Sequence, residues 1–175
     1  MCNTCLRNDI IRLEYVRNFS IFDGFFCCNP DVNDDLDDFI HKDAEQHYRD
    51  RMAVTYAAFL SDNSFNYPIG FATLQNDVLR IKHKEYRYNT SPAVKIGIFG
   101  VRIEYQRIGI GTNMLSIIKD FVFSQDKIDC RYLTLDAYNN PTTLNFYTNK
   151  NGFKFLKEPN PQRKQEILFF DLLYH

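Results

Sequence analysis

The sequence predicts a single mixed α/β domain spanning residues 1–175, and three observations support this prediction. A length of 175 residues suits one domain that buries a substantial core. Short apolar segments bounded by turn residues predict strands, and apolar residues at helical spacing between them predict helices. The chain contains no internal repeat, low-complexity tract or linker that would divide it. Hydrophobic residues at 45% and charged residues at 25% are ordinary for a globular protein.

The amino-terminal third alternates strand and helix signals. Ile10–Val16 is predicted to be a strand, and Asn18–Asn29 an irregular, phenylalanine-rich connection. Asp31–Arg49 carries a helical stripe of apolar residues, namely Val32, Leu36, Phe39, Ile40, Ala44 and Tyr48. Met52–Leu60 and Tyr67–Leu74 are predicted to be two strands joined by a polar turn, Ser61–Ser64.

Four aspartates crowd the start of the first predicted helix, at positions 34, 35, 37 and 38. A metal site is one interpretation of such a cluster. Adjacent aspartates on a helix point in different directions, however, and the helix dipole favours negative charge in the first turns. We therefore expect a solvated helix start.

The centre of the chain combines a strand, a glycine-rich turn and a helix. Ala93–Val101 is apolar and β-branched, which predicts a buried strand. After the turn Gln106–Gly111, apolar residues recur at helical spacing, at Met114, Ile117, Ile118 and Phe121. A helix amino terminus leaves backbone N–H groups unpaired and carries partial positive charge, so it binds phosphate well. Because glycine has no side chain, Gly109 and Gly111 would let an anion approach these amides closely.

Two common phosphate-binding motifs do not fit this turn. A dinucleotide fingerprint would need a third glycine where the chain has Met114. A nucleotide-triphosphate loop would need a lysine between Gly111 and Thr112. On the turn alone, an ordinary glycine-rich connection stays as open as a diphosphate site.

The segment Val78–Ser91 is basic and aromatic, with Arg80, Lys82, His83, Lys84, Arg87, Tyr86 and Tyr88. It could contact an anionic substrate or nucleic acid, or it could be a solvated excursion before Pro92. Farther along, Arg131–Tyr138 is predicted to be a strand. Asn140 and Pro141 predict the start of a helix that ends at Asn151-Gly152. Phe153–Lys157 and Gln165–Tyr174 are predicted to be a closing pair of strands.

The cysteines and the net charge limit which redox environment and which binding partners are expected. The five cysteines include Cys2-x-x-Cys5 and the adjacent pair Cys27-Cys28, without a regular framework. A zinc site is an alternative, but reduced cytoplasmic thiols are the expected state, and we expect no metal. We find neither a secretory segment nor an apolar run near the ~18 residues of a membrane-spanning helix, so no membrane partner is expected. A net charge of −1 and a pI near 6.4 mean that a nucleic-acid partner would need a local basic patch.

A second signature changes the interpretation of the glycine turn. Asn140–Tyr147 has the pattern Asn-x-x-x-x-x-Phe-Tyr, and Gly152-Phe153 follows it. Together with Gln-x-x-Gly-x-Gly at residues 106–111, in the right order, it resembles the two motifs of the GNAT superfamily of acyl-CoA N-acyltransferases. Thr143 stands where that family usually has alanine. The resemblance covers residues 94–153 in motifs and residues 10–174 in element order.

The resemblance implies a fold, a substrate and a set of site residues. The fold would be a central, mostly antiparallel sheet of six to seven strands, flanked by helices, with the fourth and fifth strands splayed around acetyl-CoA. The coenzyme-binding residues would be Phe99, Val101, Gln106, Arg107, Ile108, Gly109, Ile110, Gly111, Thr112 and Asn140. Tyr147 would be catalytic and protonate the leaving thiolate. The alternatives are an N-cap role alone for Asn140 and a packed aromatic at Tyr147.

The implied reaction is the direct attack of a neutral amine on the acetyl thioester. A backbone N–H near Val101 would stabilise the oxyanion, and Glu104 and Asp136 are candidate bases only. The acceptor would be a small-molecule or protein amine, and a homodimer is compatible with the sequence. The segment from Phe26 to Ala44 is also similar to the amino-terminal helix of GNAT toxins that acetylate aminoacyl-tRNA. A non-catalytic acyl-CoA-binding domain is the third alternative.

Overall fold

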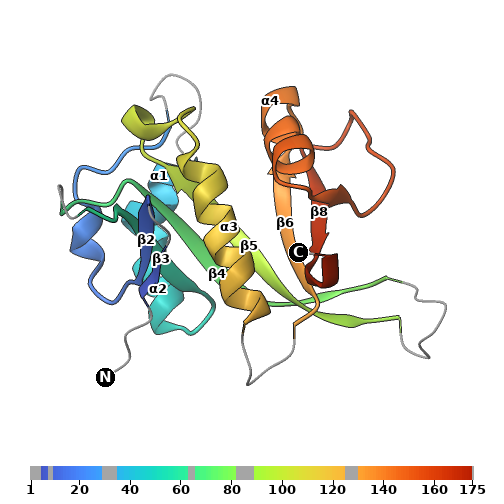
Figure 1. Ribbon diagram of the computed structural model, residues 1–175, viewed down its shortest axis with the longest axis horizontal. Coiled ribbons are helices and arrows are strands. Elements are labelled where there is room, and N and C mark those ends of the chain that lie inside the picture. Colours follow the sequence, from blue (N-terminus) through green and yellow to red (C-terminus); the bar gives the residue numbers. More distant parts are fainter. Residues whose placement is uncertain are drawn as a thin grey trace. The chain divides into compact units, whose positions relative to one another are not determined.

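The computed structural model describes residues 5–7, 10–28, 35–62, 66–81, 89–124 and 130–174. Residues 5–7 are described by their backbone alone. Eight strands form one sheet in the order β1-β2-β3-β4-β5-β6-β8-β7 (Figure 1). The strands are β1 Cys5–Arg7, β2 Ile11–Tyr15, β3 Val54–Leu60, β4 Gly70–Leu79, β5 Ser91–Val101, β6 Tyr132–Tyr138, β7 Lys154–Phe155 and β8 Gln165–Asp171. The predicted six to seven strands correspond to the longer members of this sheet, since β1 has 3 residues and β7 has 2.

The helical segments are short except for one. They are the 3-10 turn Phe19–Phe22, α1 Asp35–Asp38, the π-helical turn Phe39–Asp43, α2 Ala44–Arg49, the 3-10 turn Ile103–Tyr105, α3 Ile110–Phe123, α4 Pro141–Asn145, the π-helical turn Phe146–Lys150 and the 3-10 turn Leu172–Tyr174. None of the helices in the described ranges is long and apolar enough to cross a bilayer. Every element predicted from the sequence has a counterpart here, with shifted ends.

The chain divides into two compact units, Met1–Gln75 with Gly97–Ile118, and Asn76–Ile96 with Lys119–His175. Strands β4 and β5 and helix α3 each contribute residues to both units. The single domain expected for residues 1–175 stays a prediction.

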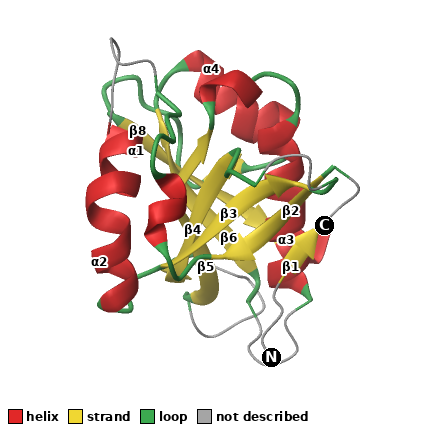
Figure 2. Ribbon diagram, turned by 90° about the vertical axis from the view of Figure 1, so that its left-hand side faces the viewer, coloured by secondary structure: helices red, strands yellow, loops and turns green. Residues whose placement is uncertain are grey.

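In the first unit, an antiparallel sheet carries helices on its two faces. Strands β2, β3 and β4 pair in register, with Leu13 opposite Ala58 and Ala57 opposite Phe71. In Figure 2, α1 and α2 lie on one side of β3 and β4, and α3 lies on the other. Gly70 makes the close approach of α3 possible, because a Cβ there would lie 2.8 Å from Met114 Sδ.

The phenylalanine-rich connection after β2 is part of the core of this unit. Asn18 caps its 3-10 turn by accepting the N–H of Ser20. The rings of Phe22, Phe25 and Phe71 meet edge to face, with centroids 5.6–5.8 Å apart. The segment is irregular, as predicted, yet Phe22, Phe25 and Cys27 are buried because they pack in one core cluster with residues of α1 and α2.

In the second unit, the parallel pairing of β5 with β6 is short. It joins Ala93–Ile96 to Tyr132–Leu135, although β5 has 11 residues and β6 has 7. On its other edge β6 pairs antiparallel with β8 along its whole length. A parallel pair that ends partway along both strands is the feature expected of the fourth and fifth strands of the predicted fold.

Several boundaries differ from the prediction for physical reasons. Strand β4 continues to Leu79 because that side chain is buried with Ala93 and Tyr132. The strand predicted to run to Tyr174 ends at Asp171 and continues as a 3-10 turn. Of the basic and aromatic segment, only the ends up to residue 81 and from residue 89 are described. Lys82, His83, Lys84, Tyr86, Arg87 and Tyr88 therefore lie outside the described residues, as do Cys2, Val32, Asp34 and the end of the predicted turn at residues 63–64.

Candidate active site

In the first unit, the glycine turn folds tightly between β5 and α3. After Val101 the chain makes the 3-10 turn Ile103–Tyr105, and α3 begins at Ile110. Arg107 and Gly109 both have left-handed backbone angles, with φ of 65° and 93°. A left-handed arginine is uncommon, and such strain persists only where the surrounding structure holds it. A Cβ added to Gly109 would meet no atom within 4 Å, so the space beside this residue is open.

The backbone amides at the end of this turn and at the start of α3 have no partner among the described residues. The first amide of α3 to bond backwards is that of Asn113, which donates to Gly109 O at 3.0 Å. Within the described ranges, no acceptor pairs with the amides from Arg107 to Thr112. These six N–H groups stand where the dipole of the 14-residue helix is positive, which is the arrangement that binds phosphate groups.

The side chain of Gln106 fixes the turn in place. Its Nε2 donates to Val101 O at 2.8 Å and to Cys27 O at 2.7 Å. Its own N–H donates to Ile103 O at 3.2 Å, so the amides that remain for an anion begin at Arg107. The side chain of Gln106 therefore bonds to the protein itself, and it joins the end of β5 and the segment at Cys27 to the turn.

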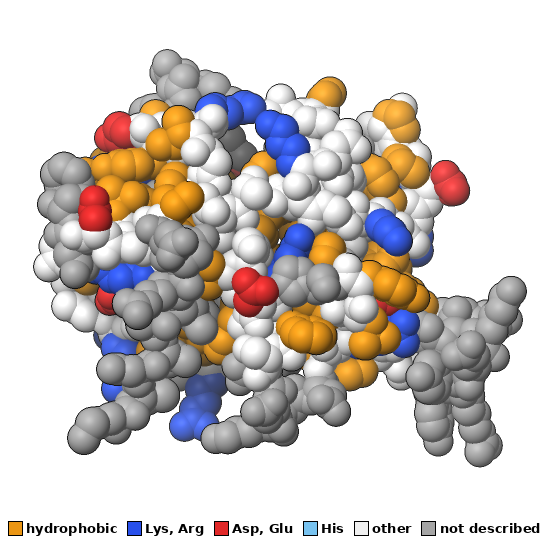
Figure 3. All heavy atoms as spheres, viewed as in Figure 1, with side chains coloured by type: hydrophobic (Ala, Val, Ile, Leu, Met, Phe, Trp, Pro, Cys, Tyr) orange, Lys and Arg blue, Asp and Glu red, His pale blue; other side chains and the backbone are white. Residues whose placement is uncertain are grey.

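The other residues predicted to bind the coenzyme in this unit differ in their exposure. Ile108 is 67% exposed at the tip of the turn, Ile110 is buried, and Gly111 and Thr112 lie in the first turn of α3. Phe99 and Val101 are partly buried in β5, beyond the last residue that pairs with β6. Hydrophobic side chains gather on the surface over the turn before α3 and the connection after β2 (Figure 3). Apolar surroundings strengthen hydrogen bonds between amides and an anion.

In the second unit, Asn140 caps the helix that leads to Tyr147. Its Oδ1 accepts the N–H of Thr143 at 2.9 Å, and Pro141 occupies the first helical position. This is the N-cap predicted from the sequence. After five residues α4 widens into the π-helical turn Phe146–Lys150, which carries Tyr147 as its second residue. Single π-helical turns occur often at functional sites, because the wider turn redirects side chains.

Tyr147 lies among aromatic rings. Its ring meets Phe146 edge-on at a centroid distance of 4.9 Å and Phe153 at 5.8 Å. Desolvation by burial raises the pKa of Tyr147 above its ordinary value. The phenol is therefore protonated throughout the physiological range, which suits a proton donor and does not suit a base.

The glycine of the second signature is required by the turn that follows Tyr147. Gly152 has a φ of 73°, and a Cβ there would lie 3.2 Å from the ring of Phe170. Its N–H donates to Thr148 O, and the next N–H, of Phe153, donates to Tyr147 O, both at 3.0 Å. The Gly-Phe pair thus closes the helix and brings a ring against Tyr147.

The two candidate bases differ in their surroundings. Glu104 has a side chain that is 64% exposed and lies 3.8 Å from an Arg102 nitrogen. Asp136 accepts a hydrogen bond from Lys95 Nζ at 2.5 Å on the neighbouring strand. This ion pair is partly buried, with side-chain exposures of 26% for Lys95 and 33% for Asp136. Neither arrangement assigns the base.

The aspartate cluster at the start of the helix is not fully solvated, contrary to expectation. Asp37 is buried, and its carboxylate accepts the N–H of Cys27 at 2.8 Å and that of Cys28 at 3.1 Å. The two sulfurs lie 4.0 Å apart. Burial raises the pKa of both thiols, so neither is poised as a nucleophile. Asp37 instead clamps the cysteine segment, whose carbonyl at Cys27 holds Gln106.

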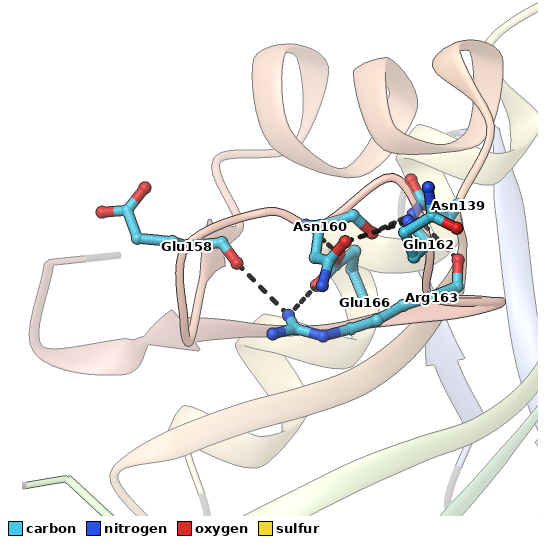
Figure 4. Close-up of polar contacts among 6 residues, drawn as sticks. All are labelled: Asn139, Glu158, Asn160, Gln162, Arg163 and Glu166. Carbon is cyan, nitrogen blue, oxygen red and sulfur yellow. Dashed lines mark hydrogen bonds and ion pairs between the residues drawn. The ribbon is translucent and has the colours of Figure 1, made fainter.

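A polar network orders the loop between β7 and β8 (Figure 4). Glu166 is buried and accepts the N–H of Asn160 at 2.7 Å and a guanidinium hydrogen bond from Arg163 at 2.9 Å. The hydrogen bond from the Asn160 backbone amide is the main cause that lowers the pKa of Glu166, and Arg163 lowers it further. Asn139, next to the cap of α4, donates to the carbonyls of Asn160 and Arg163 at 2.9 Å each.

Two buried charged residues, Lys119 and Glu166, were not identified from the sequence, although both stand at core-facing positions of their elements. Lys119 lies four residues after buried Leu115 and three before buried Val122, on the apolar face of α3. Glu166 alternates with exposed Ile167 and stands two residues before buried Leu168 in β8. A charge at a core position indicates a specific partner.

Comparison with known proteins agrees with this geometry. The model of the acetyltransferase (GNAT) family matches residues 18–153. A search of curated proteins found no significant match. Among solved structures, AtaT complexed with acetyl-methionyl-tRNAfMet is 18% identical, with a TM-score of 0.73, over 94% of this chain and 99% of that one.

Two further structures have the same fold. AtaTR bound with AcCoA is 18% identical with a TM-score of 0.74, over 95% of this chain and 96% of the other. A tyrosine-to-phenylalanine mutant of KacT is 16% identical with a TM-score of 0.73, over 94% and 96% of the two chains. The family match spans both signatures and most of the chain. The chain therefore belongs to the GNAT family of acetyltransferases and is an acyl-CoA-dependent N-acetyltransferase.

Proposed function

We propose that this enzyme transfers the acetyl group of acetyl-CoA to the primary amine of an aminoacyl-tRNA. For the donor, the proposal rests on the amides of residues 107–112, which meet the requirements of a diphosphate at the amino terminus of α3. For the acceptor, it rests on likeness to AtaT, whose structure contains acetyl-methionyl-tRNA and matches nearly the full length of both chains.

In the proposed reaction the neutral amine attacks the thioester carbon directly. The carbonyl oxygen takes up the negative charge, which a backbone N–H near Val101 would stabilise. Collapse of the intermediate breaks the carbon–sulfur bond, and the coenzyme leaves as a thiolate that takes the phenolic proton of Tyr147. A base or solvent removes the proton that the amine nitrogen loses.

The environment of Tyr147 supports this role. An ordinary tyrosine has a pKa near 10, and burial raises the pKa of this phenol further. The proton is therefore present whenever a thiolate forms. A thiolate that forms in a desolvated environment is also more basic than one in water, so the transfer stays close to matched.

The remaining predicted ligands have supporting roles in the proposal. The edge of β5 around Phe99 and Val101 would bond the amides of the pantetheine arm as an added strand does. Asn140 would contact the same arm through its side-chain amide, because its Oδ1 is already committed to the cap.

A small-molecule or protein amine is the second candidate acceptor. The observation that favours it is the net charge of −1, which gives no global basic field to attract tRNA. Arg80 is exposed near the start of the basic and aromatic segment, and residues 82–88 of that segment lie outside the described residues.

The test is incubation with isotope-labelled acetyl-CoA and charged tRNA, followed by mass spectrometry of the released amino acid. We expect label on the α-amine of the aminoacyl group, no label with uncharged tRNA, and strongly reduced label with Tyr147→Phe. Label found only on small amines or proteins would favour the second candidate. Coenzyme binding without any labelled product would favour a non-catalytic acyl-CoA-binding protein and contradict both.

A further inference from the structure

Lys119 is a buried cation that the proposed reaction does not use. It is the only buried lysine in the part of the chain that the structure describes, with 8% of its surface exposed. Burial lowers the pKa of Lys119, because desolvation disfavours its charged form. An ammonium group removed from water costs stability unless it is fully paired. A lysine at a core position of α3 therefore needs a function that an apolar residue could not supply.

Its ammonium group is held by one carbonyl and two aromatic rings of the second unit. Nζ donates to Asn151 O at 2.7 Å. It also lies 3.9 Å from the ring centroid of Phe170 and 5.4 Å from that of Phe153, within the range of cation–π attraction. All three partners belong to, or pack against, the turn that ends the π-helical segment.

That turn is bonded directly to the residue proposed to donate the proton. Asn151 Nδ2 donates to Phe146 O at 2.7 Å, and Phe153 N–H donates to Tyr147 O at 3.0 Å. The ring of Phe153 also contacts the ring of Tyr147 edge-on. Lys119 thus reaches Tyr147 along two routes, through the backbone at Asn151 and through the ring of Phe153.

We propose that Lys119 is a positioning residue that holds the π-helical turn Phe146–Lys150, and with it the Tyr147 phenol, in the orientation needed for proton transfer. The inference rests on the proposed function of Tyr147. A π-helical turn is a rare conformation that a chain keeps only where outside contacts favour it. The charged hydrogen bond to Asn151 O supplies such a contact at the carboxyl end of the turn, where a cation also complements the helix dipole.

Lys119→Met separates this role from a merely structural one. Methionine has a similar length and carries no charge, so the variant loses the hydrogen bond but also loses the cost of burying an ammonium group. We expect its melting temperature to stay close to that of the wild type. We expect kcat to fall about tenfold to a hundredfold with KM for acetyl-CoA nearly unchanged, because displacement of a catalytic group slows the chemical step.

Three further variants complete the kinetic test. Lys119→Arg keeps a charged donor and should recover most of the lost kcat. Lys150→Met removes an exposed lysine from the same turn and should change nothing. Lys119→Met combined with Tyr147→Phe should be no slower than Tyr147→Phe alone, since Lys119 acts through that phenol. A wild-type kcat in Lys119→Met, or full additivity in the double variant, would overturn the proposal.

A readout independent of activity distinguishes the failure of this inference from the failure of the proposed function. Proteins carrying ¹³C-labelled tyrosine rings give an NMR signal for Tyr147 that is assigned by its loss in Tyr147→Phe. We expect this signal to shift in Lys119→Met, to return in Lys119→Arg and to stay in place in Lys150→Met. An unmoved signal in Lys119→Met would overturn the inference. A wild-type kcat in Tyr147→Phe would overturn the proposed role of Tyr147 as proton donor, and the NMR signal would still decide whether Lys119 sets the position of the ring.

Discussion

At the scale of single residues, Tyr147 gives the sharpest test of the chemistry. Tyr147→Phe removes one oxygen and keeps the ring that packs against Phe146 and Phe153. We expect kcat to fall about ten- to a thousandfold, with little change in acetyl-CoA affinity, because only proton transfer is lost. Tyr174→Phe is the matched control, since that tyrosine is 81% exposed. Steady-state kinetics that show an unchanged kcat in Tyr147→Phe would remove the assigned role.

The raised pKa of the same phenol predicts the pH dependence. Burial favours the protonated form, so the donor stays active as the pH rises beyond about 10, the ordinary tyrosine value. We therefore expect the fall in kcat that deprotonation of Tyr147 causes to occur above about pH 10. The stability of the fold changes with pH in the same direction. The contribution of protonated Tyr147 to stability is fully present below the pKa of tyrosine in the unfolded chain, and it is lost as the pH rises through the pKa of Tyr147 in the folded protein. A limb near neutrality that Tyr147→Phe abolishes would contradict this assignment.

Individual residues also show where sequence reasoning succeeds and where it fails. The cap at Asn140 could be predicted because its partner is the N–H of Thr143, three residues away. The role of Asp37 could not, because its partners are the amides of Cys27 and Cys28, on a segment that the sequence does not bring near the helix. Local bonds are readable from spacing, whereas bonds between distant segments depend on packing.

At the scale of elements, the amino terminus of α3 is the proposed anion site. Gly111→Glu places a bulky negative side chain in the first turn of the helix, where the coenzyme diphosphate would lie. We expect acetyl-CoA binding to fall below detection in calorimetry, because like charges repel and the close approach is lost. Ser116→Glu adds the same charge to an exposed position later in α3 and should bind normally. Normal affinity in Gly111→Glu would show that the diphosphate binds elsewhere.

The N-cap of α4 makes a separate prediction about stability. Asn140→Ala removes the acceptor for the Thr143 N–H, and we expect a loss of about 1 kcal/mol in the free energy of unfolding. Asn140→Asp keeps an acceptor at the cap and should retain most of that stability. Urea unfolding of the three proteins measures the difference. Equal stabilities would mean that the cap is replaced by another group or by water.

Elements were predictable where their pattern is long and regular. The helical stripe before Arg49 located α1 and α2, but it did not reveal the π-helical turn Phe39–Asp43 between them. Periodicity reports which face is buried and does not resolve one extra residue in a turn. The strand predicted at Phe153–Lys157 shortens to β7, Lys154–Phe155, the two residues that are in ladder register with β8. Pairing register decides such ends, and the register depends on the neighbouring strand.

At the scale of the whole molecule, the family was readable and the acceptor was not. The family match spans the two signatures, whose glycines and capping asparagine are recognisable from residue type and spacing alone. An acceptor is recognised by side chains gathered from several loops, and residue types alone do not show which of them form a pocket. Fold and donor chemistry therefore follow from short motifs, whereas the second substrate requires a binding experiment.

The near-neutral charge of the molecule predicts how it would bind tRNA. Each phosphate that a lysine or arginine neutralises releases counterions, so the logarithm of affinity falls linearly with the logarithm of salt concentration. With a net charge of −1 the contacts must be local, and we expect a slope of about −2 to −4, which corresponds to only a few phosphates. Filter binding of charged tRNA across a range of salt concentrations measures this slope. Affinity that does not change with salt would exclude phosphate contacts and contradict this prediction, because counterion release makes such contacts depend on salt.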